Sequence, residues 1–120
     1  MVKIKRSMSP SAYRKLALAL PETIEHEHMG HPDFRVGGRI FATLRPDAGL
    51  GMVRLFPAQQ AEFVTQAPKV FSPVPGGWGQ RGATYILLKP ARAASVKAAL
   101  LTAWLNTAPA KLIKKFQSGQ

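Results

Sequence analysis

The spacing of apolar residues predicts a helix near the start of the chain. After Ser9 and Pro10, apolar side chains recur at intervals of three and four residues as far as Leu20, which is helical spacing. A side-chain cap followed by proline is the order expected at a helix start. We therefore predict a helix from about Pro10 to Leu20 that stops before Pro21.

Alternation replaces helical spacing in the next segment. Residues 23–29 place Ile24, His26 and His28 on one face and two glutamates on the other, which predicts a strand. Two β-prone runs, residues 34–36 and 39–44, then flank a pair of glycines, and this arrangement predicts a hairpin.

The register of this hairpin depends on the length of its loop, because a slip of one residue exchanges the two faces. A two-residue turn at Gly37-Gly38 would pair Val36 with Arg39 and put Phe34 beside Phe41. A three-residue loop would instead align one set of apolar residues on one side, namely Phe34, Val36, Ile40, Ala42 and Leu44. The sequence leaves both registers open.

The remaining pattern predicts a turn over residues 45–49, a strand over 50–56 and a helix over 57–67. Residues 68–82 hold three prolines and four glycines and predict an irregular stretch. A strand over 83–88 and two helices, after Pro90 and after Pro109, complete the chain. This order predicts an α+β domain in which helices pack on one face of an antiparallel sheet.

A length of 120 residues fits one domain. We place it at residues 9–116, between a flexible N-terminal tail, residues 1–8, and a loose C-terminus, residues 117–120. No apolar run approaches the roughly 20 residues of a membrane span, and the apolar stretch at Leu16–Leu20 is too short for a signal-peptide core. We therefore expect no membrane association.

Charge adds a functional indication to this picture. Lys and Arg number 17 against 6 Asp and Glu, for a formal net charge of +11. Such an excess favours polyanionic partners such as nucleic acid, although charge alone can also serve solubility. Four of the acidic residues lie between Glu22 and Asp33, so we expect one basic surface and one small mixed patch. The chain has no cysteine, which excludes disulfides and zinc–thiolate sites and suits a cytoplasmic location.

Four segments together resemble a known family. They read "LALALPETIEHEHMGHPDFRVGGRIFATL", "GMVRLF", "FSPVPGGWGQRGATYILL" and "LLTAWLNTAPAKL". With them the chain resembles the MmcQ/YjbR family of small bacterial proteins over about residues 9–116. The resemblance implies a frataxin-like fold, YjbR/CyaY-like, and a double-wing, DNA-binding type of domain in which β-hairpins meet the nucleic acid.

The frataxin comparison also raises iron binding, which in frataxins is associated with acidic residues on the first helix. Residues 10–20 of this chain contain Arg14 and Lys15 but no Asp or Glu. A hard cation requires oxygen ligands and a negative field. We therefore do not extend an iron role to this chain.

Arginines near the predicted turns are the candidate contacts to nucleic acid, and we expect that partner to be DNA. Arg35 and Arg39 flank the glycine turn, Arg45 begins the next turn, and Arg54 lies on the following strand. A hairpin tip that carries arginines can enter a groove or lie along the phosphate backbone. In the alternative interpretation, Arg35 and Arg54 are solvated sheet residues without a partner.

The segment "GGWGQRG" adds Trp78 and Arg81 to these candidates. It leads into a strand, whereas a Walker loop or a dinucleotide loop opens a helix, so we exclude both kinds of nucleotide site. A loop that presents Trp78 and Arg81 suits base stacking and phosphate contact. Alternatively, Trp78 packs over the sheet and the glycines only permit a tight turn.

All three histidines lie in "EHEHMGH", residues 25–31. On a strand, His26 and His28 share a face, and such a pair is a weak candidate for zinc if a third ligand comes from elsewhere. No other ligand cluster accompanies the pair. We therefore expect structural or surface histidines at the acidic margin of the domain, outside the polyanion-binding surface.

No motif in the chain indicates catalysis. The serines and threonines lack the neighbours of a nucleophile, and no carboxylate pair suggests glycosidase chemistry. We expect no catalytic residue, no cofactor, no obligate small molecule and no enzyme activity. The leading hypothesis is a DNA-binding protein of low sequence specificity, and the alternative is a protein–protein or small-ligand adaptor that uses the sheet and the Trp78 loop. Neither specifies an oligomeric state.

Overall fold

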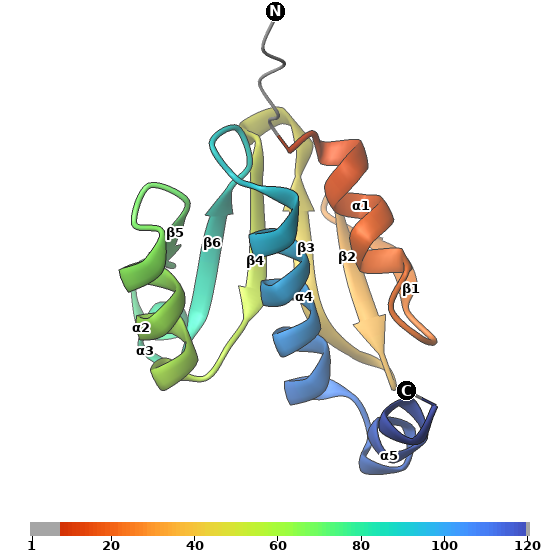
Figure 1. The fold of residues 1–120 in the computed structure, drawn as a ribbon. Helices are drawn as coiled ribbons and strands as arrows, with labels where there is room; N and C mark the ends of the chain where they lie inside the picture. The colour runs from red at the N-terminus through yellow and green to blue at the C-terminus, as the bar shows by residue number, and fades with distance from the viewer. Residues whose placement is uncertain (1–7, 120) are drawn as a thin grey trace, which may run out of the picture.

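Antiparallel strands form a single sheet in the computed structural model, which describes residues 8–119 except the side chain of His28 (Figure 1). The strands are β1 (Ile24–His28), β2 (His31–Val36), β3 (Arg39–Arg45), β4 (Leu50–Arg54), β5 (Phe71–Pro73) and β6 (Ala83–Leu87). Their order across the sheet is β1-β2-β3-β4-β6-β5. A short 3₁₀ helix, η1 (Pro46–Ala48), connects β3 to β4.

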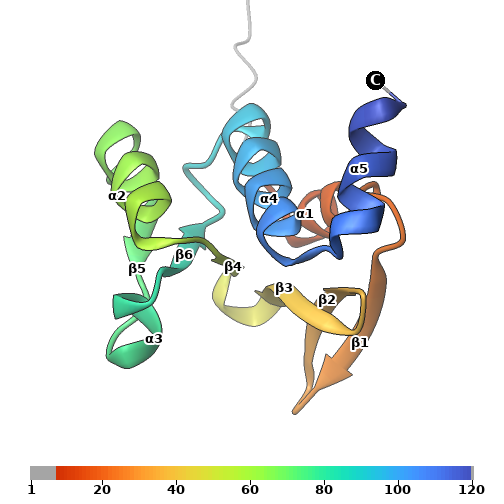
Figure 2. The same ribbon diagram turned by 90° about the horizontal axis from the view of Figure 1, so that it is seen from below.

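The longer helices all lie on one side of the sheet (Figures 1 and 2). They are α1 (Pro10–Leu18), α2 (Pro57–Gln66), α4 (Ala93–Thr107) and α5 (Ala110–Ser118). The predicted architecture, an α+β fold with helices on one face of an antiparallel sheet, is confirmed. One element differs: α3 (Gly77–Gln80), a single turn, lies on the opposite side of the sheet (Figure 2).

Helix α1 begins as its sequence predicts. The Oγ of Ser9 accepts a hydrogen bond from the backbone N–H of Ala12 at 3.0 Å, and Pro10 occupies the first turn. Tyr13 and Ala17 are its buried residues. The hydroxyl of Tyr13 donates to the backbone carbonyl of Met52 at 3.2 Å, and burial raises the pKa of Tyr13 well above its usual value. Helix α1 is therefore anchored to the middle of the sheet.

The β2–β3 turn adopts the shorter of the two expected loops. Gly37 and Gly38 have φ angles of 60° and 79°, and Val36 pairs with Arg39 across a two-residue turn. Both angles favour glycine. A Cβ atom on Gly37 would lie 2.8 Å from Cγ of Pro109. The turn therefore packs closely against the junction of α4 and α5.

A bulge changes the register a few residues beyond this turn. Arg35 pairs with Ile40, but Phe34 pairs with Ala42, so Phe41 is an additional residue in β3. Phe34, Phe41 and Ala42 are all fully buried. The hairpin thus has the two-residue turn of the first predicted register. Beyond the bulge, its apolar residues share one face as in the second predicted register, except for Ile40, which lies on the opposite face with Arg35.

The core lies between the sheet and the layer of helices. Trp104 of α4 is fully buried, and its indole Nε1–H donates to the backbone carbonyl of Pro21 at 3.0 Å. Phe116 of α5 packs on Trp104 with ring centroids 5.1 Å apart. These contacts hold α4 and α5 on the helix side. Of the helices within residues 8–119, only the short α3 lies on the other side of the sheet.

The segment over residues 68–82 is more regular than predicted. It contains β5, whose Phe71 pairs with Ile86 of β6, and α3. Proline is tolerated in β5 because this strand is the edge of the sheet. Long-range pairing with β6 therefore imposes structure where proline and glycine alone indicated none.

The ends of the domain differ slightly from the predicted limits. Met8 is buried, and its N–H donates to the carbonyl of Leu88 at 3.3 Å. Helix α5 continues to Ser118, beyond the predicted domain end at residue 116. The rest of the predicted N-terminal tail lies outside the described residues.

Candidate functional site

The side of the sheet opposite the long helices, here called the open face, carries polar, apolar and basic side chains. Successive residues of a strand point to opposite faces, so the neighbours of the buried core residues project from it. Thr43 of β3 pairs with Met52 of β4, and Met52 pairs with Tyr85 of β6. The three side chains therefore lie side by side across the open face. Figure 2 shows this face between α3 at one side and the β1–β2 hairpin at the other.

Two shallow depressions adjoin on the open face. One, of about 160 Å³, is lined by residues that include Met52, Trp78 and Tyr85. The other, of about 210 Å³, extends toward Met29 and His31 at the β1–β2 turn. Thr43 and Arg45 line both. We call the two together the open-face groove, and Arg45 lies at its middle.

Arg45, Arg54 and Arg81 are exposed basic residues at this side of the molecule. Arg45 and Arg54 project from the open face because their neighbours Leu44 and Val53 are buried in the core. The ion pairs found within residues 8–119 include none of these three arginines. Their charges are therefore available to an anionic partner.

Arg35 also lies on the open face, but it is paired. Its Nε and Nη2 atoms donate to Asp33 Oδ1 and Oδ2 at 2.9 and 3.2 Å. The hydrogen bonds to this carboxylate raise the pKa of Arg35. Asp33 is only 2% exposed, and a buried carboxylate without a partner would be strongly destabilising. Arg35 thus compensates the charge of Asp33.

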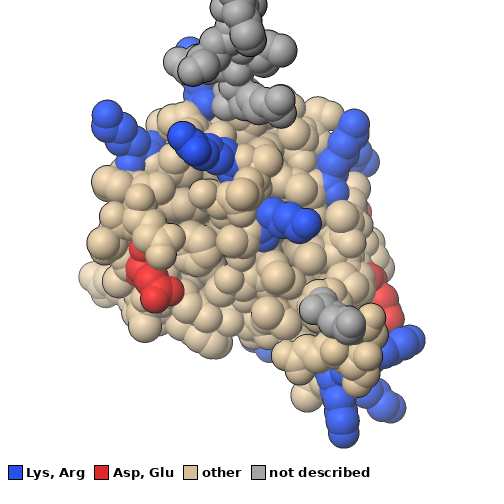
Figure 3. All heavy atoms as spheres, in the orientation of Figure 1, with Lys and Arg blue, Asp and Glu red and all other residues tan. Residues whose placement is uncertain are grey.

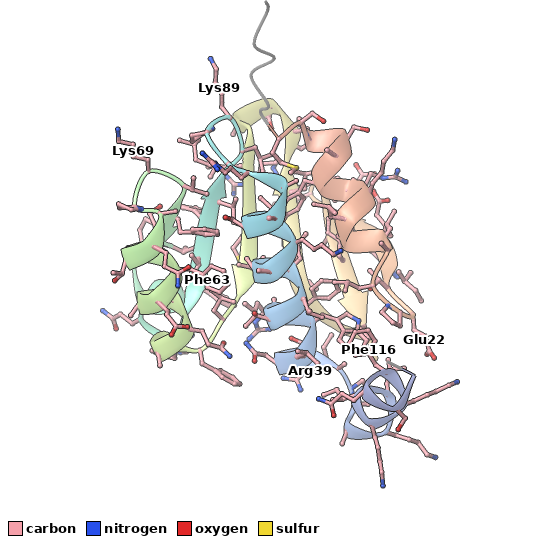
Figure 4. All side chains as sticks on the ribbon, in the orientation of Figure 1. Glu22, Arg39, Phe63, Lys69, Lys89 and Phe116 are labelled. Carbon is pink, nitrogen blue, oxygen red and sulfur yellow. The ribbon has the colours of Figure 1, made fainter. Side chains whose placement is uncertain are left out.

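Arg39 lies apart from the other candidate residues. It pairs with Val36, whose side chain is buried on the helix side, and Figure 4 shows Arg39 near the C-terminal end of α4. The sheet therefore separates Arg39 from the open-face groove. Apart from Arg35, which is bound to Asp33 in the groove lining, the structure brings four of the six sequence-predicted residues to the surroundings of this groove: Arg45, Arg54, Trp78 and Arg81.

Trp78 is 60% exposed and forms one wall of the groove. The guanidinium carbon of Arg81 lies 5.9 Å from the centre of its ring, within the range of a cation–π contact. Trp78 is thus presented to solvent beside a cation, as one of the two sequence interpretations expects, although it stands on a helical turn rather than a loop.

The helical turn that carries Trp78 is held tightly to the sheet. A Cβ atom on Gly79 would lie 1.6 Å from the carbonyl oxygen of Val74, and one on Gly82 would lie 2.0 Å from that of Leu55. The side-chain amide of Gln60 donates to the carbonyls of Gly79 and Ala83, both at 3.0 Å. The glycines of this segment therefore permit close backbone packing, a role that neither sequence interpretation included.

The helix side of the molecule has a different distribution of charge. In Figure 3 its basic side chains are spread over a surface that also shows acidic side chains at the left and at the right edge, and they gather mainly at α5. The lysines of α5 are Lys111, Lys114 and Lys115, and all are exposed. The two depressions found on this side among the residues described, one beside Phe116 and one beside Phe63, have no arginine in their lining.

The histidine segment does not form a metal cluster in the part of the chain that is described. No group of three or more histidine, cysteine, aspartate or glutamate residues is placed to hold a metal ion there. His26 pairs with Asp33 across β1 and β2, but the side chain of His28 lies outside the described residues. Glu25 is instead bound to Arg14, whose Nε donates to Oε1 at 2.7 Å.

Sequence reasoning missed the residues that form the floor of the groove. Tyr85 is expected in the core from its apolar neighbours, yet it is half-buried on the open face beside Met52. Strand β6 has the polar Thr84 on its core face and the apolar Leu87 on its open face, so alternation does not identify its faces. The pairing of β6 with β4 determines which face Tyr85 takes.

Comparison with known proteins yields a family and a fold. The family model described as YjbR matches residues 18–108, more than half of the chain. The fold is similar to the crystal structure of Deinococcus radiodurans protein DR2400, which carries the domain DUF419. The TM-score is 0.69 at 17% sequence identity, over 83% of this chain and 78% of that chain. No curated protein matches the chain.

None of the helices within residues 8–119 has the length and apolar content needed to span a bilayer.

Proposed function

The chain belongs to the YjbR family, and from this premise we propose that it is a non-enzymatic DNA-binding protein. It contacts phosphates with the arginines around its open-face groove and has low sequence specificity. The observation that carries the proposal is the position of Arg45, Arg54 and Arg81, exposed and free of ion pairs within the described chain, at a face that no helical layer covers.

Electrostatics supports a polyanionic partner. The formal net charge of +11 attracts phosphates at long range, and guanidinium groups bind phosphate oxygens in a bidentate geometry. The carboxylate within the groove, that of Asp33, is already compensated by Arg35. A strand of phosphates on the open face therefore meets a net positive charge.

Low specificity follows from the kinds of contact available. Arginine–phosphate contacts position a protein on DNA but carry no sequence information. The element that projects from the open face beside the groove is α3, with only four residues, which is too short to serve as a recognition helix in the major groove. We therefore expect similar affinity for unrelated sequences of equal length and form.

Anisotropy titrations at several salt concentrations test the proposal. DNA is supplied both as a duplex and as a single strand. Three phosphate contacts give a log–log salt slope of about −2.7 on duplex and about −2.1 on a single strand. Absence of binding to both forms at about 50 mM salt, or a slope near zero, overturns the proposal.

The second candidate is an adaptor that binds a protein or a small ligand. Its support is the exposure of large apolar side chains on the same face, which include Ile24 at 60% and Leu87 at 45%. Such exposed apolar surface is typical of interaction sites. An adaptor of this kind would show no affinity for DNA in the titrations above.

A further inference from the structure

Trp78 is exposed although the fold has a well-formed core. The other tryptophan, Trp104, is fully buried, whereas Trp78 leaves 60% of its surface in solvent. An exposed aromatic ring beside a groove is typical of a recognition site rather than of a stability element.

The backbone that carries the ring is also held in place before any ligand arrives. Gln60 fixes the carbonyls at both ends of the turn from Gly79 to Ala83, and Gly79 packs directly on the backbone of Val74. A binding group that is already ordered loses little conformational entropy on association. Trp78 thus provides a flat surface at one wall of the groove, on a backbone turn that is already ordered.

The groove combines this surface with nearby cations. Arg81 lies 5.9 Å from the Trp78 ring, and Arg45 lines the same depression as Trp78 and Tyr85. Aromatic rings that stack bases, interleaved with cations that meet phosphates, are the elements by which proteins bind single strands. In a duplex the faces of the bases are stacked on one another and cannot reach such a ring.

The groove is long enough for more than one nucleotide. It runs from Tyr85 on β6 across β4 and β3 to Asp33 on β2. These strands span three inter-strand spacings, or about 14 Å. Its two depressions adjoin at Arg45, so a chain that crosses the sheet meets a cation between two recesses.

We propose that the open-face groove binds single-stranded nucleic acid, with one base stacked on Trp78 and the flanking phosphates at Arg45 and Arg81. This inference rests on the proposed DNA-binding function and adds the form of nucleic acid that is bound. Sequence tolerance follows, because every base presents a flat face to the ring.

Three ligands of equal length test the inference by anisotropy at low salt. They are a single strand of about 12 nucleotides, the same strand annealed to its complement, and a chain of abasic sugar phosphates that keeps the charge without the bases. We expect the single strand to bind most tightly and the abasic chain about 5- to 150-fold more weakly, the range for loss of one stacked base.

Substitutions of Trp78 test the same stacking contact from the side of the protein. Trp78→Ala should weaken binding of the normal strand by a similar factor and leave binding of the abasic chain unchanged, whereas Trp78→Phe should restore part of the affinity. Phe56→Ala removes an aromatic side chain that is also largely exposed, at 54%, outside the groove, and serves as the control.

The outcomes separate this inference from the function on which it rests. Equal binding of the normal and abasic chains, or binding of the duplex at least as tight as of the single strand, overturns the single-strand inference while DNA binding stands. Failure of all three ligands to bind overturns the proposed function itself.

Discussion

Arg39 and Arg45 occupy the two ends of β3, six residues apart, and strict alternation would place both side chains on the same face. The additional residue at Phe41 breaks this alternation. Arg39 therefore lies on the helix side and Arg45 at the middle of the open-face groove. A single buried phenylalanine thus decides which arginine can contact a ligand on the open face.

This difference makes Arg39 a matched control for the groove arginines. Each of Arg45→Ala and Arg54→Ala removes one phosphate contact, so each should reduce the magnitude of the duplex salt slope by about 0.9, or about 0.7 on a single strand. Arg39→Ala removes the same charge on the other side of the sheet and should leave the slope unchanged. Salt-dependent anisotropy measures the slope for all three variants. An equal reduction of the slope by Arg39→Ala would show that the open-face groove is not the site of phosphate contact.

Tyr13 connects pH to stability at the same scale. Its pKa is raised by burial, so the folded state disfavours the phenolate. The resulting stabilisation is complete below the unfolded-state pKa of about 10 and is lost as the pH rises above it toward the folded-state pKa. The free energy of unfolding should fall by up to about 1.4 kcal/mol per pH unit in that range.

Urea unfolding of the wild type and of Tyr13→Phe, at several pH values on either side of about 10, measures this effect. The variant should be less stable at neutral pH, because the hydrogen bond to Met52 is lost, but its stability should fall less steeply above pH 10. All other ionisable groups are common to the two proteins and cancel in the difference. Parallel pH profiles would show that Tyr13 ionisation is not coupled to unfolding.

At the scale of elements, α3 depends on α2 for its position. Helix α2 contributes Gln60, whose amide donates to two carbonyls around α3. The turn itself has only four residues, and so short a helix is not stable alone. The orientation of Trp78 is therefore a tertiary property that two helices and β6 determine together.

Gln60→Ala tests this dependence. Loss of the amide removes two hydrogen bonds, each worth about 0.5–1.5 kcal/mol, and should cost about 1–3 kcal/mol of stability. Both carbonyls keep a backbone donor, the N–H of Gly82 for Gly79 and that of Val74 for Ala83. Hydrogen exchange of the amides from Trp78 to Gly82 should become faster, because α3 loses its contact to α2. Gln66→Ala, an exposed position at the end of the same helix, should change stability by less than about 0.5 kcal/mol. Equal effects of the two variants would contradict the role of Gln60.

At the scale of the whole molecule, the two sides of the sheet have separate roles. The helix side holds the core through Tyr13, Trp104 and their neighbours, and the open face keeps its arginines, Trp78 and Tyr85 accessible. A ligand on the open face therefore binds without displacing core contacts. Binding to the folded state alone must also stabilise it.

A single strand at 100 times its dissociation constant should stabilise the fold by about 2.7 kcal/mol, seen as a rise in melting temperature by circular dichroism. The rise should vanish at high salt, since phosphate contacts weaken there, and should be smaller for a variant that carries both Arg45→Ala and Arg54→Ala. A rise that persists at high salt would indicate an apolar partner surface instead.

The sequence by itself determined the fold class of this protein and most of its elements, although not β5 or α3. Local signals suffice for these, since Ser9-Pro10 caps α1 and Gly37-Gly38 permits the left-handed turn between β2 and β3. The basic excess and the resemblance of the chain to its family are likewise properties of the sequence.

Only the tertiary structure decided which side chains share the open face. Three features depend on residues distant in sequence: the bulge at Phe41, the pairing of β5 with β6, and the face of the sheet from which Tyr85 projects. A one-residue change of register exchanges the faces of a strand, and local alternation cannot detect it where both faces are apolar. Packing of the core selected the register, and the register assembled the groove.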